Sequence, residues 1–162
     1  MAEAPYATKA HILSGQGAAR FGQRWNPPGI LAIYMCLSPD LAMREWQAQR
    51  RKAGMTSHRH LPLTQITISV KLQKVLDFRK AAVKTAFGRP LAPFIAERHT
   101  PQIEGDPEMR AQALGRIAHS RNLEAIIVPS AQNHSMFNLV AYKDTFTTGS
   151  KLEIHGHEYL LP

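Results

Sequence analysis

The sequence predicts a single compact domain spanning residues 1–162, of the α+β class, with a mixed, mostly antiparallel sheet flanked by helices. The length of 162 residues is that of one domain, and no internal repeat or long Gly/Ser linker divides it. A content of 44% apolar and 20% charged residues is typical of a globular protein. Strand-like and helix-like segments follow one another without a regular strand–helix–strand rhythm, which favours α+β over a doubly wound sheet.

The first elements are delimited by their turn residues. Four glycines and two prolines within residues 14–29 predict an ordered loop with no regular element. The short apolar run at 30–37 follows and predicts a buried strand. A capping Ser38 and a stop at Gly54 then predict a helix over residues 39–52.

The remaining elements are expected at more widely spaced positions. Residues 66–72 alternate apolar and polar side chains, which predicts a half-exposed strand. Helices are expected over 80–87, before a glycine, and over 107–121, where apolar residues recur with helical spacing. Further strands are expected at 124–128, 138–143 and, as an edge strand, 152–161.

The net charge of +8, with a pI near 10.0, is concentrated in one half of the chain. Residues 1–80 carry 12 basic and 4 acidic side chains, whereas residues 81–162 carry 8 of each. A basic half favours an anionic ligand, either nucleic acid or something smaller, bound by that half.

The single cysteine and the N-terminal residues bear on the cellular compartment. Because Cys36 is the single cysteine, an intrachain disulfide is excluded. It lies in the apolar run, so it is expected to be buried. The N-terminus shows no secretion or lipidation signal, and no stretch approaches the ~18 apolar residues of a membrane span. We therefore expect a cytoplasmic protein without membrane association.

Glu45 is an anomaly in the expected helix. It lies on the same side as Leu41, Trp46 and Ala48, within the stripe that should face the core. One interpretation is a pair with Gln49 or a charge at the edge of the stripe. The other is a pocket carboxylate that stabilises developing positive charge or acts as a base. The helical pattern leaves both open.

Arg20 and Arg24 lie in the glycine-rich segment. Exposed backbone N–H groups and bidentate guanidinium donors suit a phosphate or pyrophosphate. Alternatively, an arginine stacks on Trp25 or pairs with a carboxylate to hold the loop. The pattern alone does not decide between ligand binding and loop anchoring.

Ser130 follows Pro129 at the end of an expected strand, where a hydroxyl either completes a turn or faces a ligand. Asn138 is one of several polar residues that then form a possible ligand rim. No Gly-x-Ser-x-Gly elbow surrounds the serine, which disfavours a serine hydrolase.

The histidines give no metal-binding pattern. His58 and His60 alternate, as do His155 and His157, but no His-Glu-x-x-His or Cys-x-x-Cys spacing accompanies them, so no metal site is expected. The basic run 50–52 is more simply a solvated helix end than a nucleic-acid surface.

Several short motifs together resemble the RES-domain toxins, a family named for an Arg, a Glu and a Ser. They are LSGQGAARFGQRWNPPG at 13–29, Ile33-Tyr34, Leu37-Ser38, Glu45, IIVPSA at 126–131 and Asn138-Leu139-Val140. The resemblance implies an ADP-ribosyltransferase-like domain that consumes NAD as its substrate and uses no metal. It also implies a type II toxin that arrests growth, paired with an Xre-like antitoxin that covers the active site and mediates any contact with nucleic acid.

The resemblance assigns roles residue by residue. Arg24, Glu45 and Ser130 would be the catalytic Arg, Glu and Ser, and Tyr34 the aromatic wall beside the nicotinamide ribose. The residues expected to bind NAD are Arg20, Arg24, Asn26, Tyr34, Ser130 and Asn138. Cleavage of the nicotinamide–ribose bond would follow, with water, phosphate or a side chain of a protein target as the acceptor.

Two alternative functions stay open, and the first of them follows from two departures from the family pattern. Gln23 stands where a second glycine is usual, and Lys9 precedes the Ser-Gly segment where an arginine is common. An inactive RES-like module that binds NAD without turnover is one alternative. The other is a basic toxin that binds or cleaves RNA through residues 58–60 and 50–52.

Overall fold

The computed structural model describes residues 2–3, 8–52, 54, 63–97 and 107–155. His58, Arg59, His60 and His157 lie outside the described residues, as does the end of the strand expected at 152–161. Among the residues that are described, no helix is both long enough and apolar enough to cross a membrane.

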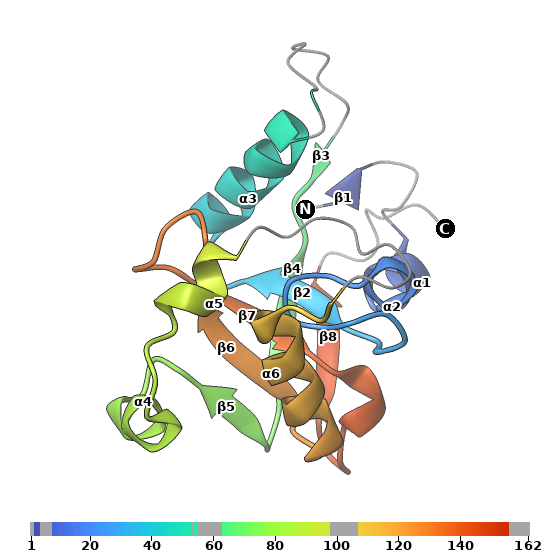
Figure 1. Cartoon of the computed structure of the whole chain (residues 1–162). Helices are drawn as coiled ribbons and strands as arrows, with labels where there is room; N and C mark the ends of the chain where they lie inside the picture. Colours follow the sequence, from blue (N-terminus) through green and yellow to red (C-terminus); the bar gives the residue numbers. More distant parts are fainter. Residues whose placement is uncertain (1, 4–7, 53, 55–62, 98–106, 156–162) are drawn as a thin grey trace.

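A four-stranded sheet, in the order β2-β7-β6-β5, forms the centre of the molecule (Figure 1). Its strands are β2 (Ile33–Cys36), β5 (Val75–Asp77), β6 (Ala125–Pro129) and β7 (Phe137–Ala141). Only the β5–β6 pair of this sheet is parallel; β2–β7 and β6–β7 are antiparallel. The expectation of an α+β fold with a mixed, mostly antiparallel sheet is confirmed.

Two further strand pairs lie outside the central sheet. The antiparallel pair β4 (Thr67–Lys71) and β8 (Lys151–His155) matches the two expected strands in these regions. The short strands β1 (Ala2–Glu3) and β3 (Leu63–Thr64) pair antiparallel and were not expected.

Six α-helices and one 3-10 helix are present in the described part of the chain. They are α1 (Lys9–Ile12), α2 (Gln16–Phe21), α3 (Pro39–Lys52), α4 (Ala81–Phe87), α5 (Ala92–Ala96), α6 (Arg110–Ser120) and η2 (Lys143–Thr145). The α3 bounds confirm the capping argument, because the Ser38 hydroxyl accepts the Leu41 N–H at 3.2 Å and Gly54 adopts a φ of 68°.

The segment 14–29 corrects an expectation, because it contains a helix where only a loop was expected. Gly15 and Gly22, at φ 68° and 64°, bracket the six residues of α2 and supply the backbone reversals on either side. Six residues are too few to show a helical period. The flanking glycines therefore indicated a loop, although they lie at the two ends of a short helix.

The central sheet is buried on both faces. One face packs with Trp25 and with α6, which crosses β6 in Figure 1; its buried members include Ile126, Val128, Val140, Ala111, Leu114 and Ala118. The other face holds Ile33, Ala125, Ile127, Leu139 and Ala141. Since side chains alternate along a strand, burial of both faces explains why β6 is apolar at successive positions.

A buried carboxylate anchors the beginning of β6. The side chain of Glu124 accepts the backbone N–H groups of Gln73 and Thr147 at 2.6 and 2.8 Å, and the Ser150 hydroxyl at 2.9 Å. Burial alone raises the pKa of a carboxyl, but the hydrogen bonds, led by those from Thr147, outweigh it and lower the pKa of Glu124 to about 2. The ionised carboxylate therefore joins the turns before β5 and before β8 to the sheet.

Candidate functional site

Three polar side chains from separate elements converge at one end of the central sheet. Helix α3 carries Glu45, Ser130 directly follows β6, and Asn138 lies in β7. The Ser130 hydroxyl donates to Glu45 Oε1 at 2.7 Å, and the Asn138 side-chain amide donates to the same oxygen at 2.9 Å. Glu45 is thus bound to the sheet and not to Gln49 on its own helix.

The Ser130 hydroxyl is held in one orientation. Ser130 is fully buried, its N–H donates to the Met136 carbonyl at 2.8 Å, and its Oγ accepts the Gln132 N–H at 2.9 Å. Since the oxygen accepts from the turn, the hydroxyl proton is directed to Glu45. The same serine completes a turn and contacts the carboxylate, so the turn interpretation is confirmed, while its role toward a ligand stays a prediction.

Two acceptor atoms at this convergence have no partner among the described residues. Glu45 uses only Oε1, so Oε2 is uncommitted, and Asn138 Oδ1 is buried without a hydrogen bond. A buried unpaired acceptor is unfavourable unless a donor completes it. The arrangement therefore suits a ligand that brings hydroxyl or amide donors.

Arg24 approaches the same region from the loop after α2. Its Nη1 donates to the carbonyls of Ile95 and Glu97 at 2.8 and 2.6 Å. Burial lowers the pKa of the Arg24 guanidinium, while attraction to Glu45, Tyr34 and Glu97 partly opposes that shift. Nη2 and Nε donate to no partner within the described residues, so one edge of the guanidinium is fixed and the other remains available for an anion.

The loop that carries Arg24 is held from both sides at the next residue. Trp25, 2% exposed, donates its N–H to the Tyr34 hydroxyl at 2.9 Å, and its carbonyl accepts the Tyr142 hydroxyl at 3.0 Å. Gly115 on α6 also touches this carbonyl, because a Cβ at that position would lie 1.8 Å from the Trp25 oxygen. The position of Arg24 is consequently determined by α6, β2 and the segment after β7.

The family model of the RES domain matches residues 2–161. The chain belongs to the RES domain family. It is 33% identical over 129 residues to the NAD(+) phosphorylase MbcT of Mycobacterium tuberculosis, and to MbcT of Mycobacterium bovis with the same figures. These matches cover 76% of this chain and 64% of each relative, so the chain spans less than two thirds of their length.

A solved structure supports the fold assignment for this RES domain. The crystal structure of the M. tuberculosis MbcT–MbcA toxin–antitoxin complex contains a chain that is similar with a TM-score of 0.67 and 30% identity. The similarity covers 88% of the RES domain described here and 74% of that chain.

The other residues expected at the NAD site of the RES domain occupy different environments. Tyr34 is 38% exposed through its ring, whereas its hydroxyl is enclosed and donates to Asn26 Oδ1 at 2.9 Å; burial raises the pKa of this hydroxyl well above 10. Asn26 is fully buried, and its Nδ2 donates to the Ala18 carbonyl of α2 and to the loop carbonyls of Pro27 and Ile30. Arg20 is exposed on α2, with its guanidinium 5.0 Å from the Phe21 ring.

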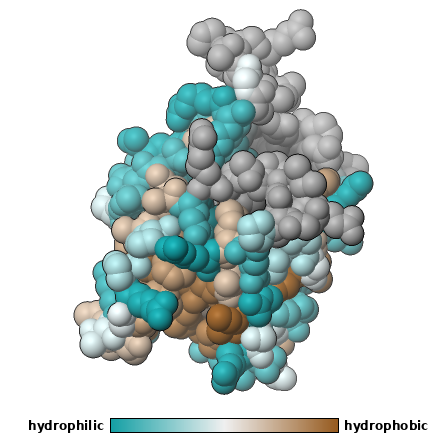
Figure 2. Space-filling model, in the orientation of Figure 1, coloured by the Kyte–Doolittle hydropathy of each residue, from teal (hydrophilic) through white to brown (hydrophobic). Residues whose placement is uncertain are grey.

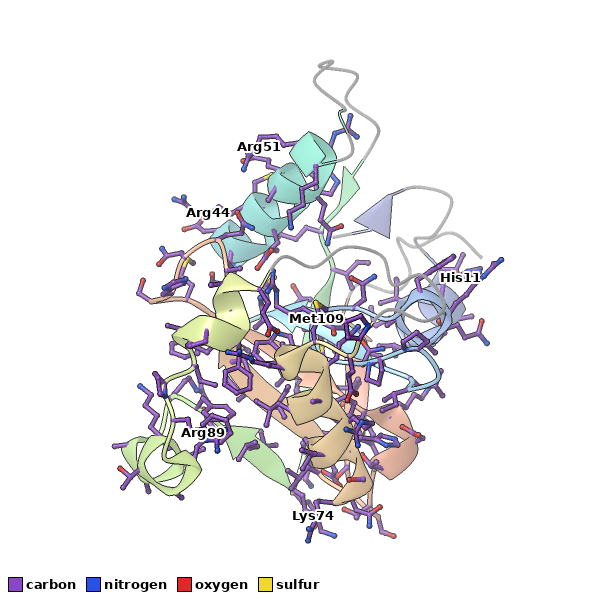
Figure 3. All side chains as sticks on the ribbon, in the orientation of Figure 1. His11, Arg44, Arg51, Lys74, Arg89 and Met109 are labelled. Carbon is purple, nitrogen blue, oxygen red and sulfur yellow. The ribbon has the colours of Figure 1, made fainter. Side chains whose placement is uncertain are left out.

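Helix α3 has an inner and an outer side in this RES domain. Glu45 faces the sheet, while Arg44 and Arg51 project outward, as Figure 3 shows, and both are exposed. The guanidinium of Arg50 lies over the ring of Trp46, 5.0 Å from the ring centroid. Arg51 and Lys52 thus form the exposed end of the helix, whereas Arg50 is half-buried and its Nη1 has no hydrogen-bond partner among the described residues.

Sequence reasoning missed the residues that hold the Arg24 loop. Tyr142 and Gly115 belong to no short motif, and they meet Trp25 only after folding. One signal was available, namely a glycine in the interior of the otherwise helical pattern at 107–121, which requires a packing reason.

The described residues contain no group of three or more His, Cys, Asp or Glu side chains arranged to hold a metal ion. His155, one of the alternating histidines, instead contacts the Ser69 hydroxyl on the neighbouring strand. Cys36 is partly buried, and burial together with the nearby Glu45 raises the pKa of its thiol to about 11. A thiolate nucleophile is therefore disfavoured at this position.

Proposed function

We propose that this protein cleaves the nicotinamide–ribose bond of NAD and acts as the toxin of a toxin–antitoxin pair. The observation that carries the proposal is Glu45, whose Oε1 is fixed by Ser130 and Asn138 while Oε2 remains uncommitted. When the C–N bond breaks, neutral nicotinamide leaves with the bonding electron pair and the ribose becomes an oxocarbenium-like cation. A fixed carboxylate beside that carbon stabilises the positive charge without having to reorganise.

The surrounding side chains divide the remaining tasks. Arg24 holds the pyrophosphate through the guanidinium edge that the Ile95 and Glu97 carbonyls leave available. The exposed ring of Tyr34 packs against the substrate and excludes water, and its hydroxyl holds the Arg24 loop through Trp25.

Ser130, Asn138, Asn26 and Arg20 act at different distances from the reacting carbon. Ser130 orients the carboxylate of Glu45, and Asn138 adds an acceptor, Oδ1, for a ribose hydroxyl or the nicotinamide amide. Asn26 supports binding through the loop, since its side chain is committed to loop carbonyls. Arg20, at the exposed end of α2, meets a phosphate only at the outer margin of the site.

Inorganic phosphate is the acceptor that we favour. The relatives at 33% identity are named NAD(+) phosphorylase, and phosphate oxygen is a competent nucleophile toward an oxocarbenium carbon. Its attack gives ADP-ribose 1″-phosphate, with nicotinamide as the second product. Attack by water would give ADP-ribose, and attack by a protein side chain would give an ADP-ribosylated target, as in the ADP-ribosyltransferase-like reaction.

An antitoxin is the proposed partner. The similar solved chain was crystallised in a toxin–antitoxin complex, which supports a partner for this chain as well. We propose an Xre-like antitoxin that covers Glu45 and Arg24. Expression without this partner is then expected to arrest bacterial growth, and harmless expression at full folded yield would contradict the role of toxin.

The direct test is product analysis of NAD incubated with the purified protein, with and without phosphate. Nicotinamide release that requires phosphate, with a product of the mass of ADP-ribose phosphate, is the expected result. Opposite charges about 4 Å apart attract by about 4 kcal/mol at an effective dielectric of about 20, so Glu45→Gln is expected to slow release about 10³-fold. Glu153→Gln, an exposed carboxylate on β8, is the matched control and should leave the rate unchanged. Absence of nicotinamide release by the wild-type protein, or equal release by Glu45→Gln, would refute the proposal.

A further inference from the structure

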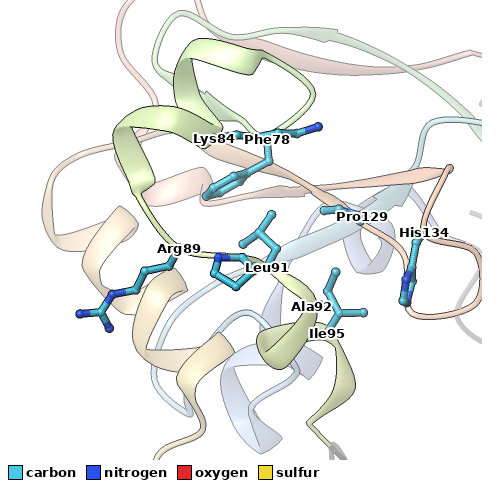
Figure 4. Close-up of a pocket in the computed structure, with 9 residues that line it drawn as sticks. Phe78, Lys84, Arg89, Leu91, Ala92, Ile95, Pro129 and His134 are labelled. Atoms are coloured by element: carbon cyan, nitrogen blue, oxygen red, sulfur yellow. The ribbon is translucent and has the colours of Figure 1, made fainter.

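A pocket lies next to the proposed catalytic residues. It has a volume of about 250 Å³ and lies between α4, α5 and the end of β6. Figure 4 shows its inner wall, which is formed by Phe78, Leu91, Ile95 and Pro129. Figure 2 shows hydrophobic surface in the region between α4 and α6, with hydrophilic residues around it.

The rim of this pocket is basic. Lys84, Arg89 and His134 lie at its edge and are exposed, and Figure 4 shows the Arg89 side chain projecting away from the cup. Pro90 and Ala92 complete the lining, which includes no carboxylate. Among the ion pairs of the described residues, none involves Lys84 or Arg89. An apolar cup with uncompensated cations at its edge is complementary to a flat aromatic group that carries an anion.

The size of the pocket limits what enters it. Its volume of about 250 Å³ is below the ~300–1,000 Å³ typical of sites that enclose a whole drug-sized ligand. The pocket therefore accommodates one ring system of a larger molecule, with the anion and the rest of the ligand outside the cup.

Two residues connect the pocket to the proposed catalytic residues. Pro129 lines the pocket and is bonded to Ser130, whose hydroxyl contacts Glu45. Ile95 lines the pocket through its side chain, while its carbonyl accepts Arg24 Nη1 at 2.8 Å. Arg24 thus lies between the pocket and the carboxylate, where the pyrophosphate of a bound dinucleotide would connect the two.

We infer that this pocket binds the adenosine-phosphate half of the dinucleotide, with the base in the cup of Phe78, Leu91, Ile95 and Pro129, Lys84 at the rim and the phosphate directed toward Arg24. This inference rests on the proposed function, since it assigns the second half of the same substrate. The base is recognised by shape and burial, because the inner wall consists of apolar side chains. Free AMP has the same chemistry and competes with NAD for the pocket.

The first experiment measures AMP binding by titration calorimetry, which requires no turnover. The wild-type protein should bind AMP, and Leu91→Trp, which fills the cup with a larger side chain, should abolish detectable binding. Lys84→Ala removes a rim cation without touching the core and should weaken binding severalfold, whereas Arg121→Ala, an exposed arginine after α6, is the control. Thermal unfolding establishes that each variant is folded. Unchanged AMP affinity in both folded pocket variants, or no AMP binding by the wild type, would overturn the inference.

The second experiment separates this inference from the proposed function. Leu91→Trp is expected to raise the KM for NAD at least tenfold with little change in kcat, because the reacting ribose is not touched. Turnover of nicotinamide mononucleotide, which has the same ribose and no adenosine, should be equal in the variant and the wild type. If both substrates are affected equally, the pocket is not the adenosine site although NAD is cleaved. If AMP binds as expected but wild-type protein releases no nicotinamide, the proposed function fails and the nucleotide pocket stands.

Discussion

Gly115 offers a sharp test of how the fold positions Arg24. A Cβ added at this residue of α6 would lie 1.8 Å from the Trp25 oxygen, 2.6 Å from the Trp25 carbonyl carbon and 2.9 Å from the Tyr142 hydroxyl. Both neighbours are buried, and the nearest contacts are to backbone, so the clash cannot be relieved by turning a flexible side chain. Gly115→Ala must therefore displace the Trp25 carbonyl or α6.

The magnitude follows from the distances. Restoring even a 3.0 Å separation from 1.8 Å requires a movement of about 1.2 Å. Overpacking costs about 1–3 kcal/mol and loss of the Tyr142 hydrogen bond about 0.5–1.5 kcal/mol, against a gain of about 1 kcal/mol in helix propensity. We expect a net destabilisation of about 1–3 kcal/mol. A displacement of about 1 Å at Arg24, one residue away, is expected to lower kcat/KM about 10²-fold.

Urea unfolding and NAD turnover measure the two effects separately. Gly17→Ala is the matched control, because Gly17 lies in α2 and a Cβ there meets nothing within 4 Å. Tyr142→Phe removes only the hydroxyl and should lower stability by about 1 kcal/mol and turnover severalfold. The reasoning is refuted if Gly115→Ala keeps the stability and turnover of the wild type, or if Tyr142→Phe leaves both unchanged.

Three further predictions concern other contacts. Tyr34→Phe leaves the Trp25 N–H without its 2.9 Å acceptor and should destabilise the protein by about 1–3 kcal/mol in urea unfolding; unchanged stability would contradict this. The pKa of Glu124 is lowered from 4.5 to about 2, so the stability it provides is present above 4.5 and is lost as the pH falls toward 2; Glu124→Gln should flatten this part of the pH–stability curve, and an unchanged curve would show that other groups cause it. Asn138→Asp places a second carboxylate where an amide now donates to Glu45 at 2.9 Å, so NAD turnover should fall at least tenfold at neutral pH, whereas Asn138→Ser should fall less.

The sequence was sufficient where one residue type marks one local structure. The Ser38 cap and Gly54 stop define the ends of α3 as observed, and Asn122, at φ 55°, follows α6 near its expected end. It was insufficient for β5 and α5, which have three and five residues and show no measurable period. Such short elements form because neighbouring strands and helices complete their hydrogen bonds and bury their side chains.

The net charge shows the same limit. Composition places the whole +8 excess in residues 1–80, which favours an anionic ligand. The structure separates the cations within that half: Arg24 is held by carbonyls near Glu45, while Arg44 and Arg51 project into solvent. The structure also places Lys84 and Arg89, which belong to residues 81–162 with no net charge, at the edge of the pocket between α4, α5 and the end of β6.

By itself, the sequence determined the fold class and the main helix and strand positions, and through the family resemblance it predicted Arg24, Glu45 and Ser130 as the catalytic residues. Only the tertiary structure decided that Glu45 accepts from Ser130 and Asn138, and that Asn26 holds the loop. The physical reason is separation along the chain, since Glu45 and Ser130 are 85 positions apart in the sequence. Local propensity acts over a few residues, whereas the distance between these side chains depends on strand register and on how α3 packs against the sheet.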